Sequence, residues 1–186
     1  LSPNTDPAGT WDAGYRYDSL RIACFSHLHS WQLSGVPVMP TTKQFSGGGF
    51  DVYASSFSHE REVAQPGYYR VRLEDQRIDA EITATSRVGF HRYTFPPSGA
   101  RALVFDMCSE LGPSRMADAR CVQNGPKGFC GYVENETTSR RNRRIRVYFS
   151  VELNCNIASW IDIPTIESHA AGAGVYLELE GGNRPV

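Results

Sequence analysis

The residues best suited to chemistry are two histidines and a tryptophan that stand close together in segment 25–35. The sequence there reads Phe-Ser-His-Leu-His-Ser-Trp-Gln-Leu-Ser-Gly. If the segment is a strand, its side chains alternate between two faces, so His27, His29 and Trp31 lie together. Phe25 falls on the same face and Gln32 on the opposite one. One face therefore carries two imidazoles beside an indole.

Three interpretations fit that face. An indole can stack on the apolar face of a sugar ring while imidazole nitrogens bond its hydroxyls, which suits a carbohydrate site. His-x-His on a strand also offers two metal ligands side by side. The alternative is a structural strand whose histidines are satisfied by hydrogen bonds in the core. The spacing does not choose among them.

The composition indicates one ordinary globular domain over residues 1–186. Hydrophobic residues make up 40% of the chain, charged residues 21%, and the formal net charge is -1, so we expect no nucleic-acid or membrane partner. No apolar run reaches the roughly 18 residues of a membrane span. The first residues lack the basic and apolar regions of a signal peptide, and we interpret the start as the middle of something longer.

Alternation at period two dominates the chain and predicts strands. The alternating or strand-like segments are 20–25, 68–73, 78–85, 88–95, 102–107, 145–157 and 175–180. Pro37 and Pro40 interrupt the segment Val36 to Met39, which predicts an edge or an extended connection there. With Pro/Gly turns between strands and no long helical pattern, the fold class is predicted as all-β, an antiparallel β-sandwich.

Two further groups of charged residues are candidates for chemistry. Asp79 and Glu81 lie two apart on a predicted strand, about 6.6 to 6.8 Å between Cα atoms, a separation similar to that of an inverting glycosidase's carboxyl groups. A solvated strand face satisfies the same spacing, and we favour it. Five arginines between 140 and 146 could bind phosphates or anionic sugars. A solvated turn, or pairing with acids of another domain, fits them better.

The cysteines give weaker indications. None of the five forms a CxxC pair or a zinc spacing, and their odd number leaves at least one outside an internal bridge. The turn-rich segment between Cys121 and Cys130 makes a disulfide between them plausible. Asn135-Glu136-Thr137 is an N-glycosylation sequon, which would matter only in a secretory route.

Several ordered blocks of the chain together resemble the N-terminal β-sandwich domain of glycoside hydrolase family 92, the calcium-dependent exo-acting α-mannosidases. They run from residue 1 to about residue 157. The blocks are Leu-Ser-Pro-Asn-Thr at 1–5, Gly-Tyr-Arg-Tyr-Asp at 14–18, Phe-Ser-His-Leu-His at 25–29, Val-Met-Pro-Thr-Thr at 38–42, Phe-Ser-His-Glu at 57–60 with Glu-Val-Ala-Gln-Pro-Gly-Tyr-Tyr at 62–69, Ala-Thr at 84–85 with Arg87, Gly89 and His-Arg-Tyr-Thr-Phe-Pro at 91–96, and Arg-Val-Tyr-Phe at 146–149.

The resemblance implies a domain that lacks both an upstream piece and a following helical (α/α)-barrel. In the family, that barrel carries the catalytic acid and base and the calcium ligands, so no catalytic or metal-binding residue can be named here and this chain alone is expected to be inactive. The implied activity of the whole enzyme is inverting α-mannosidase hydrolysis, in which calcium helps hold the mannose ring, as in the degradation of N-glycans.

The same resemblance implies that this domain forms one wall of the mannose pocket. The substrate-binding residues are then His27, His29, Trp31 and Gln32. The expected partners are mannose-containing glycans and the barrel domain, and the surface left exposed without the barrel predicts self-association. A secreted, periplasmic or cell-surface location is expected. The competing function is a free-standing carbohydrate-binding β-sandwich module without catalysis. The third candidate function is a structural or assembly domain with no ligand.

Overall fold

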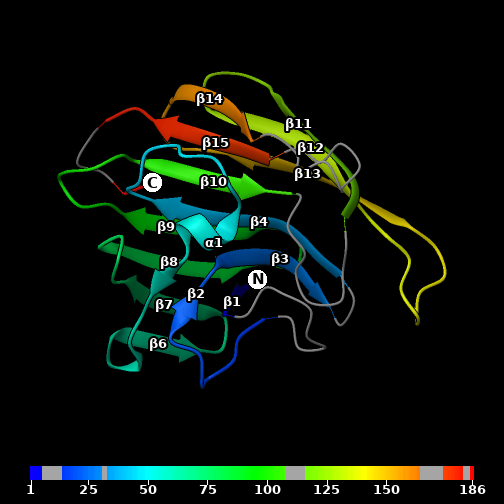
Figure 1. The fold of residues 1–186 in the computed structure, drawn as a ribbon, viewed down its shortest axis with the longest axis horizontal. Coiled ribbons are helices and arrows are strands. Elements are labelled where there is room, and N and C mark those ends of the chain that lie inside the picture. Colours follow the sequence, from blue (N-terminus) through cyan, green and yellow to red (C-terminus); the bar gives the residue numbers. More distant parts are fainter. Residues whose placement is uncertain (6–13, 31–32, 108–115, 164–173, 182–184) are drawn as a thin grey trace.

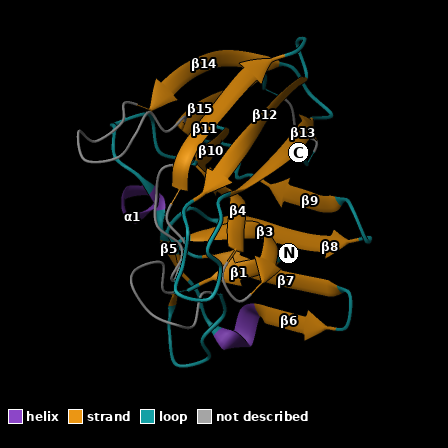
Figure 2. Cartoon of the chain, turned by 90° about the vertical axis from the view of Figure 1, so that its right-hand side faces the viewer, coloured by secondary structure: helices purple, strands orange, loops and turns teal. Residues whose placement is uncertain are grey.

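The chain folds into two layers of antiparallel strands. The computed structural model describes residues 1–5, 14–30, 33–107, 116–163, 174–181 and 185–186. For residues 28–30 and 33–34 it describes the backbone but not the side chains. Figures 1 and 2 show one large sheet, from β14 to β1, with two smaller sheets against it. The prediction of an all-β antiparallel sandwich is confirmed.

The large sheet has six strands in the order β1-β3-β4-β10-β15-β14. Every neighbouring pair in it is antiparallel. Its central strands are covered on both sides, and all five residues of β10 are buried. The bounds are β1 Ser2–Asn4, β3 Cys24–Ser30, β4 Leu33–Thr41, β10 Ala102–Asp106, β14 Ile157–Ile163 and β15 Gly174–Leu179.

The second layer consists of a four-stranded sheet, β6-β7-β8-β9, and a three-stranded sheet, β11-β12-β13. A short two-stranded sheet joins β2 to β5. The bounds are β2 Arg21–Ile22, β5 Ser55–Ser56, β6 Glu62–Gln65, β7 Tyr68–Leu73, β8 Ile78–Ala84, β9 Gly89–Thr94, β11 Met116–Gln123, β12 Gly128–Asn135 and β13 Ile145–Glu152.

Aromatic contacts show that both small sheets lie on one face of the large sheet. Phe25 of β3 packs against His91 and Tyr93 of β9. Phe105 of β10 meets Phe129 of β12 edge to face, with ring centroids 4.9 Å apart. Because these contacts reach both halves of the second layer, a single core extends through the molecule.

The opposite face of the large sheet is covered by the segment after β4. This segment includes α1 (Phe50–Tyr53), a single helical turn whose Phe50 and Tyr53 are buried. Tyr176 of β15 lies against Phe45 and Tyr53. A second short helix, η1 (His59–Arg61), begins at Ser58, whose side chain accepts a hydrogen bond from the Glu60 amide.

The prediction for the proline-containing segment 36–39 is wrong. β4 is an interior strand between β3 and β10, not an edge. Val38 pairs with Phe25 and Gly35 with His27, so one extra residue is inserted on the β4 side. Pro37 falls in this β-bulge and Pro40 lies beyond the last β3–β4 pair, so neither occurs in that ladder.

The alternation from residue 145 to 157, which predicted one long strand, is divided between two strands in the structure. Its first part is β13 and its end begins β14, which belong to different sheets. The inward side chains of β13 are only half-buried. β11 and β12 were not predicted, although the Asn124-Gly125-Pro126 turn between them is a hairpin signal.

Phe129 is the residue on which the attachment of the three-stranded sheet depends most. It is fully buried and its ring touches Phe105, Phe149 and Trp160. We expect Phe129→Ala to lower the free energy of unfolding by about 3–5 kcal/mol, the usual cost of removing a buried aromatic ring. Urea unfolding followed by circular dichroism measures it.

The matched control is Tyr148→Ala on neighbouring β13, because Tyr148 is 73% exposed. Its effect should stay within about 0.5 kcal/mol. Equal losses from the two substitutions would show that Phe129 is not the anchor.

Candidate functional site

The four residues predicted to bind sugar fall on or between β3 and β4. His27 is described in full, and its half-buried ring lies between the large sheet and the four-stranded sheet. His29 lies in β3, but its side chain is outside the described residues. Trp31 and Gln32 lie outside them altogether. The two strands pair as far as Ser30 with Leu33, which flank them.

The predicted shared face holds for only part of the segment. The rings of Phe25 and His27 both contact His91 of β9, so these two side chains do share a face. The β3–β4 register then shifts again between His27 and Ser30. Because an inserted residue interrupts the alternation, the period of two cannot be carried from His27 to the end of the strand.

A chain of three hydrogen bonds runs from β9 through β3 to the bulge of β4. The Tyr93 hydroxyl lies 2.6 Å from His91 Nδ1. His91 Nε2 lies 2.8 Å from His27 Nε2. His27 Nδ1 lies 2.5 Å from the carbonyl oxygen of Val36. The chain therefore connects the two layers of the sandwich.

The direction of every bond in this chain follows from its last acceptor. A carbonyl oxygen only accepts, so His27 Nδ1 must carry the hydrogen and donate to Val36. A neutral imidazole has one donor and one acceptor, so His27 Nε2 accepts from His91 Nε2–H. His91 Nδ1 then accepts from the hydroxyl of Tyr93. With both imidazoles neutral, each therefore has one defined tautomer.

The surroundings of the two imidazoles favour this neutral state. Burial lowers the pKa of His91 to about 3, and the neighbouring His27 acts in the same direction. Burial also lowers the pKa of His27, although its bond to Val36 opposes the shift. A proton added to His27 would be accommodated only if His91 changed its tautomer and reversed its bond with the Tyr93 hydroxyl.

Gly89 closes the site around His27 from β9. A Cβ atom at position 89 would lie 2.8 Å from His27 Cδ2, a distance that such atoms do not adopt without movement. The His27 ring cannot yield easily, because both of its nitrogens are hydrogen-bonded. Only a glycine therefore fits beside the ring.

A second polar cluster gathers around Glu62 at the start of β6. Its carboxylate accepts hydrogen bonds from the Tyr15 hydroxyl at 2.9 Å and the Tyr69 hydroxyl at 2.6 Å. His59 Nδ1 lies 2.6 Å from the same carboxylate. Only 8% of the Glu62 side chain is exposed. Burial and the bond to Glu62 raise the pKa of both tyrosines, so they remain neutral donors.

His59 differs from the buried pair in its charge. Its Nδ1 faces the Glu62 carboxylate, and its Nε2 lies 2.8 Å from the carbonyl oxygen of Tyr17. Both partners only accept, so both nitrogens donate and the ring is an imidazolium. The bond to Glu62 accordingly raises the pKa of His59. The Tyr17 ring stacks on it, with centroids 4.1 Å apart.

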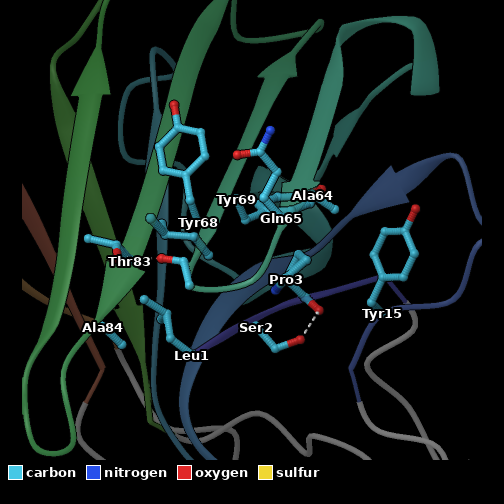
Figure 3. Close-up of a pocket in the computed structure, with 12 residues that line it drawn as sticks. Leu1, Ser2, Pro3, Tyr15, Ala64, Gln65, Tyr68, Tyr69, Thr83 and Ala84 are labelled. Atoms are coloured by element: carbon cyan, nitrogen blue, oxygen red, sulfur yellow. Dashed lines mark hydrogen bonds between the residues drawn. The ribbon is translucent and has the colours of Figure 1, made fainter.

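A cavity of about 320 Å³ lies beside the Glu62 cluster. Figure 3 shows Tyr15, Tyr68 and Tyr69 around it, with Gln65 and Thr83 supplying polar groups. It is open and mainly apolar. Its wall is formed by Leu1, Ser2, Pro3, Tyr15, Ala64, Gln65, Gly67, Tyr68, Tyr69, Ile82, Thr83 and Ala84. Aromatic rings with hydroxyl and amide groups at the rim are the surroundings that a sugar ring prefers.

The carboxylates at 79 and 81 are structural. Asp79 binds Arg72 at 2.6 Å, and Glu81 binds Arg92 through both of its oxygens. These bonds to Arg92, with one from Tyr68, lower the pKa of Glu81 to about 2. A general acid needs the opposite shift, so this pair does not fit glycosidic catalysis.

The arginine run pairs within its own sheet. Arg144 and Arg146 contact Glu134 and Glu136 of β12 and the segment after it, and Arg146 also lies near Asp118 of β11. Acids of another domain are therefore not needed to explain them.

The disulfide predicted between Cys121 and Cys130 is wrong, and the sequon is buried. Cys121 pairs across the β11–β12 ladder with Gly131, and Cys130 pairs with Val122. Cross-strand partners share a face, so the two sulfurs lie on opposite faces and cannot form a disulfide. Asn135 of the sequon is only 1% exposed and could not be glycosylated in this fold.

The described residues supply no calcium site that could be tested. Nowhere among them do three His, Cys, Asp or Glu side chains gather in a way that could hold a metal ion. Within the same part of the chain, no helix has the length and apolar character needed to span a membrane.

Sequence reasoning missed the residues that hold His27 in place. His91 and Tyr93 are two apart on β9, so the period of two already put them on one face. The pattern could not show which strand of the other sheet faces these two residues, because the approach of β9 to β3 depends on how the two layers stack. Glu62, Tyr15 and Tyr69 were missed for the same reason.

Comparison with known proteins fixes the family. A family model described as the glycosyl hydrolase family 92 N-terminal domain matches residues 1–176. The chain belongs to this family. The resemblance noted from the sequence blocks is thereby confirmed. A search of curated proteins found no significant match.

Solved structures of family 92 enzymes share the fold of this domain. The α-mannosidase BT3965 from Bacteroides thetaiotaomicron, in complex with mannoimidazole, superposes with a TM-score of 0.79 at 22% identity. The inverting mannosidase BT2199 from the same species gives 0.75 at 19%, and the glycosyl hydrolase ccman5 gives 0.72 at 21%. These matches cover 97–99% of this chain but only 25–27% of the solved chains. The chain thus spans about a quarter of the length of those enzymes.

The buried histidine pair predicts a loss of stability in acid. The pKa of His91 is near the ordinary imidazole value of 6.5 in the unfolded chain but about 3 in the folded chain. Between these values the unfolded state holds more protons, so falling pH favours unfolding, with a slope of up to about 1.4 kcal/mol per pH unit for each proton. His91→Gln should flatten the slope between pH 6.5 and pH 4.5, measured by urea unfolding at each pH.

The control is His59→Gln. The pKa of His59 is raised, so its stabilising effect is present below its unfolded pKa and is lost as the pH rises through the folded value. This variant should therefore change the slope above about pH 6.5 and leave the acid side unaltered. If His91→Gln kept the wild-type slope in acid, the buried pair would not be its source.

Proposed function

We propose that this domain is part of an α-mannosidase and forms one wall of its mannose-binding pocket, through the β3–β4 hairpin that carries His29, Trp31 and Gln32. Membership of glycoside hydrolase family 92 supports the enzyme class. The observation that carries the site is the hairpin itself. Its base is tied to the second layer by the His27–His91 bond, and its strands pair up to Ser30 and Leu33.

The chemistry of these residues suits a sugar. An indole can stack on the apolar face of a mannose ring, while an imidazole and an amide bond its hydroxyls. His27 contributes differently, because its two ring nitrogens already bond Val36 and His91. Within the proposal, His27 holds the wall and the residues after it contact the ligand.

We place the reaction itself in a helical domain that follows in the whole enzyme. One carboxylic acid there would protonate the leaving oxygen and a carboxylate would activate water, with inversion at the anomeric carbon. The calcium ligands would lie in that domain as well. Val88 and Phe90, about half exposed on the four-stranded sheet, fit a surface that another domain covers, or through which copies of this chain associate.

This division of labour predicts that the 186-residue chain alone hydrolyses no α-mannoside. The measurement is release of mannose from aryl α-mannosides and α-linked mannobioses, with calcium and with chelator. Added calcium should change nothing. Mannose released in a calcium-stimulated manner by the pure chain would refute the proposal.

Replacing Trp31 with alanine tests the wall directly. In the enzyme that contains this domain, we expect a loss of mannoside affinity of at least about tenfold, because stacking contacts of this size are worth about 1–3 kcal/mol. The melting temperature of the 186-residue chain should hardly change. A core tryptophan would behave in the opposite way, costing about 3–5 kcal/mol of stability. Trp160→Phe is the control, since that half-buried ring packs on Phe129 from the edge of the core.

A carbohydrate-binding module is the second candidate, and one observation favours it. The tyrosine-lined cavity is formed within this one chain, as a free-standing module requires. Titration of methyl α-mannoside into the chain, followed by NMR, separates the two functions. Shifts at Tyr15, Tyr68 and Tyr69 that disappear in Tyr68→Ala would favour the module. Shifts confined to residues 28–34 would favour the pocket wall.

A further inference from the structure

The base of the β3–β4 hairpin contains a backbone conformation that needs support. Val36 has a φ of 46°, in the left-handed region that β-branched residues avoid. It also precedes Pro37, which disfavours helical conformations at the preceding residue. Val36 is only 5% exposed. Such a conformation persists only where its surroundings hold it in place.

The contact that holds this bulge comes from His27. Val36 has no partner of its own in the β3–β4 register, and its carbonyl oxygen lies at the bulge. That oxygen accepts the hydrogen of His27 Nδ1. A buried carbonyl without this partner would be costly. The bulge therefore depends on His27 presenting an N–H at this position.

His27 presents that N–H because of the two residues that follow it in the series of hydrogen bonds, His91 and Tyr93. His27 Nδ1 carries the hydrogen when Nε2 is the acceptor, and Nε2 is the acceptor when His91 donates to it. His91 donates from Nε2 when its Nδ1 accepts, and the Tyr93 hydroxyl supplies that bond. Tyr93 is 2% exposed, so water does not compete freely for its hydroxyl.

We propose that His91 and Tyr93 are positioning residues for the hairpin proposed above to bind sugar: they fix the tautomer of His27, which holds the Val36 bulge at the base of the β3–β4 hairpin. Both residues lie on β9, in the other layer of the sandwich. The orientation of the hairpin is thus set by hydrogen bonding across the core. The link to sugar binding rests on the function proposed above, whereas the tautomers and the bulge do not.

Two measurements on the 186-residue chain test this without any ligand. The first is the nitrogen-15 NMR spectrum of the histidine rings at pH 7. We expect His27 as the Nδ1–H tautomer and His91 as the Nε2–H tautomer, while His59 shows two protonated nitrogens. Either member of the buried pair in the other tautomer would overturn the proposal, and no variant is needed to see it.

The second measurement is amide hydrogen exchange of segment 28–38 in variants. Tyr93→Phe removes the hydroxyl and keeps the ring, so exchange in this segment should accelerate about tenfold, the effect of losing about one net hydrogen bond. His91→Phe should do the same. His91→Gln keeps an N–H donor at the position of Nε2 and should restore slow exchange. In each case the exchange of β7 and β8 should stay as in the wild type.

Tyr69→Phe is the matched control. It removes another phenol hydroxyl from the same sheet, but one that bonds Glu62 instead of a histidine. It should leave both the His27 tautomer and segment 28–38 unchanged. Unaltered exchange in Tyr93→Phe and His91→Phe, or equal acceleration in Tyr69→Phe, would overturn the proposal.

The outcome is separable from that of the proposed function. Trp31→Ala reports on sugar binding and leaves the chain of three bonds intact. If that variant binds mannosides normally while the tautomers are as expected, the pocket assignment fails and the positioning chain stands. If the tautomers differ while Trp31→Ala loses affinity, the reverse holds.

Discussion

A hydrogen bond between two neutral imidazoles, His27 and His91, is the interaction on which the site depends. It crosses from one layer of the sandwich to the other in a region otherwise joined by apolar and aromatic contacts. An apolar contact tolerates rotation and small slides, whereas this bond fixes a distance and a direction. The layers are therefore held in register at this point, which lies at the base of the β3–β4 hairpin.

The two polar clusters of the second layer show how one residue type takes opposite charge states. His91 sits among apolar groups and another imidazole, and remains neutral. His59 faces a carboxylate and a carbonyl, and is cationic. The sequence shows a histidine in each case. The group that faces each ring decides whether the histidine is neutral, as at His91, or belongs to an ion pair, as at His59. Tertiary packing determines which group that is.

The sequence predicted the fold class and most strands because their alternation is local. It placed β4 at an edge because a bulge, which removes Pro37 from the ladder, leaves no clear local pattern. For the site, it selected the β3–β4 hairpin but could not see His91, 64 residues away in sequence. The roles of His29, Trp31 and Gln32 lie outside the described side chains and stay predictions. Contacts between layers are what a one-dimensional pattern lacks.

The close approach of Gly89 to His27 means that the substitutions accepted at one of these positions depend on the residue at the other. A methyl group at 89 would collide with an imidazole that cannot turn away. Position 89 can accept a side chain only after position 27 has become smaller, and that first change breaks the bond to His91. Any path that exchanges both residues passes through an intermediate with a loosened hairpin. The order in which these two positions can change is thereby constrained.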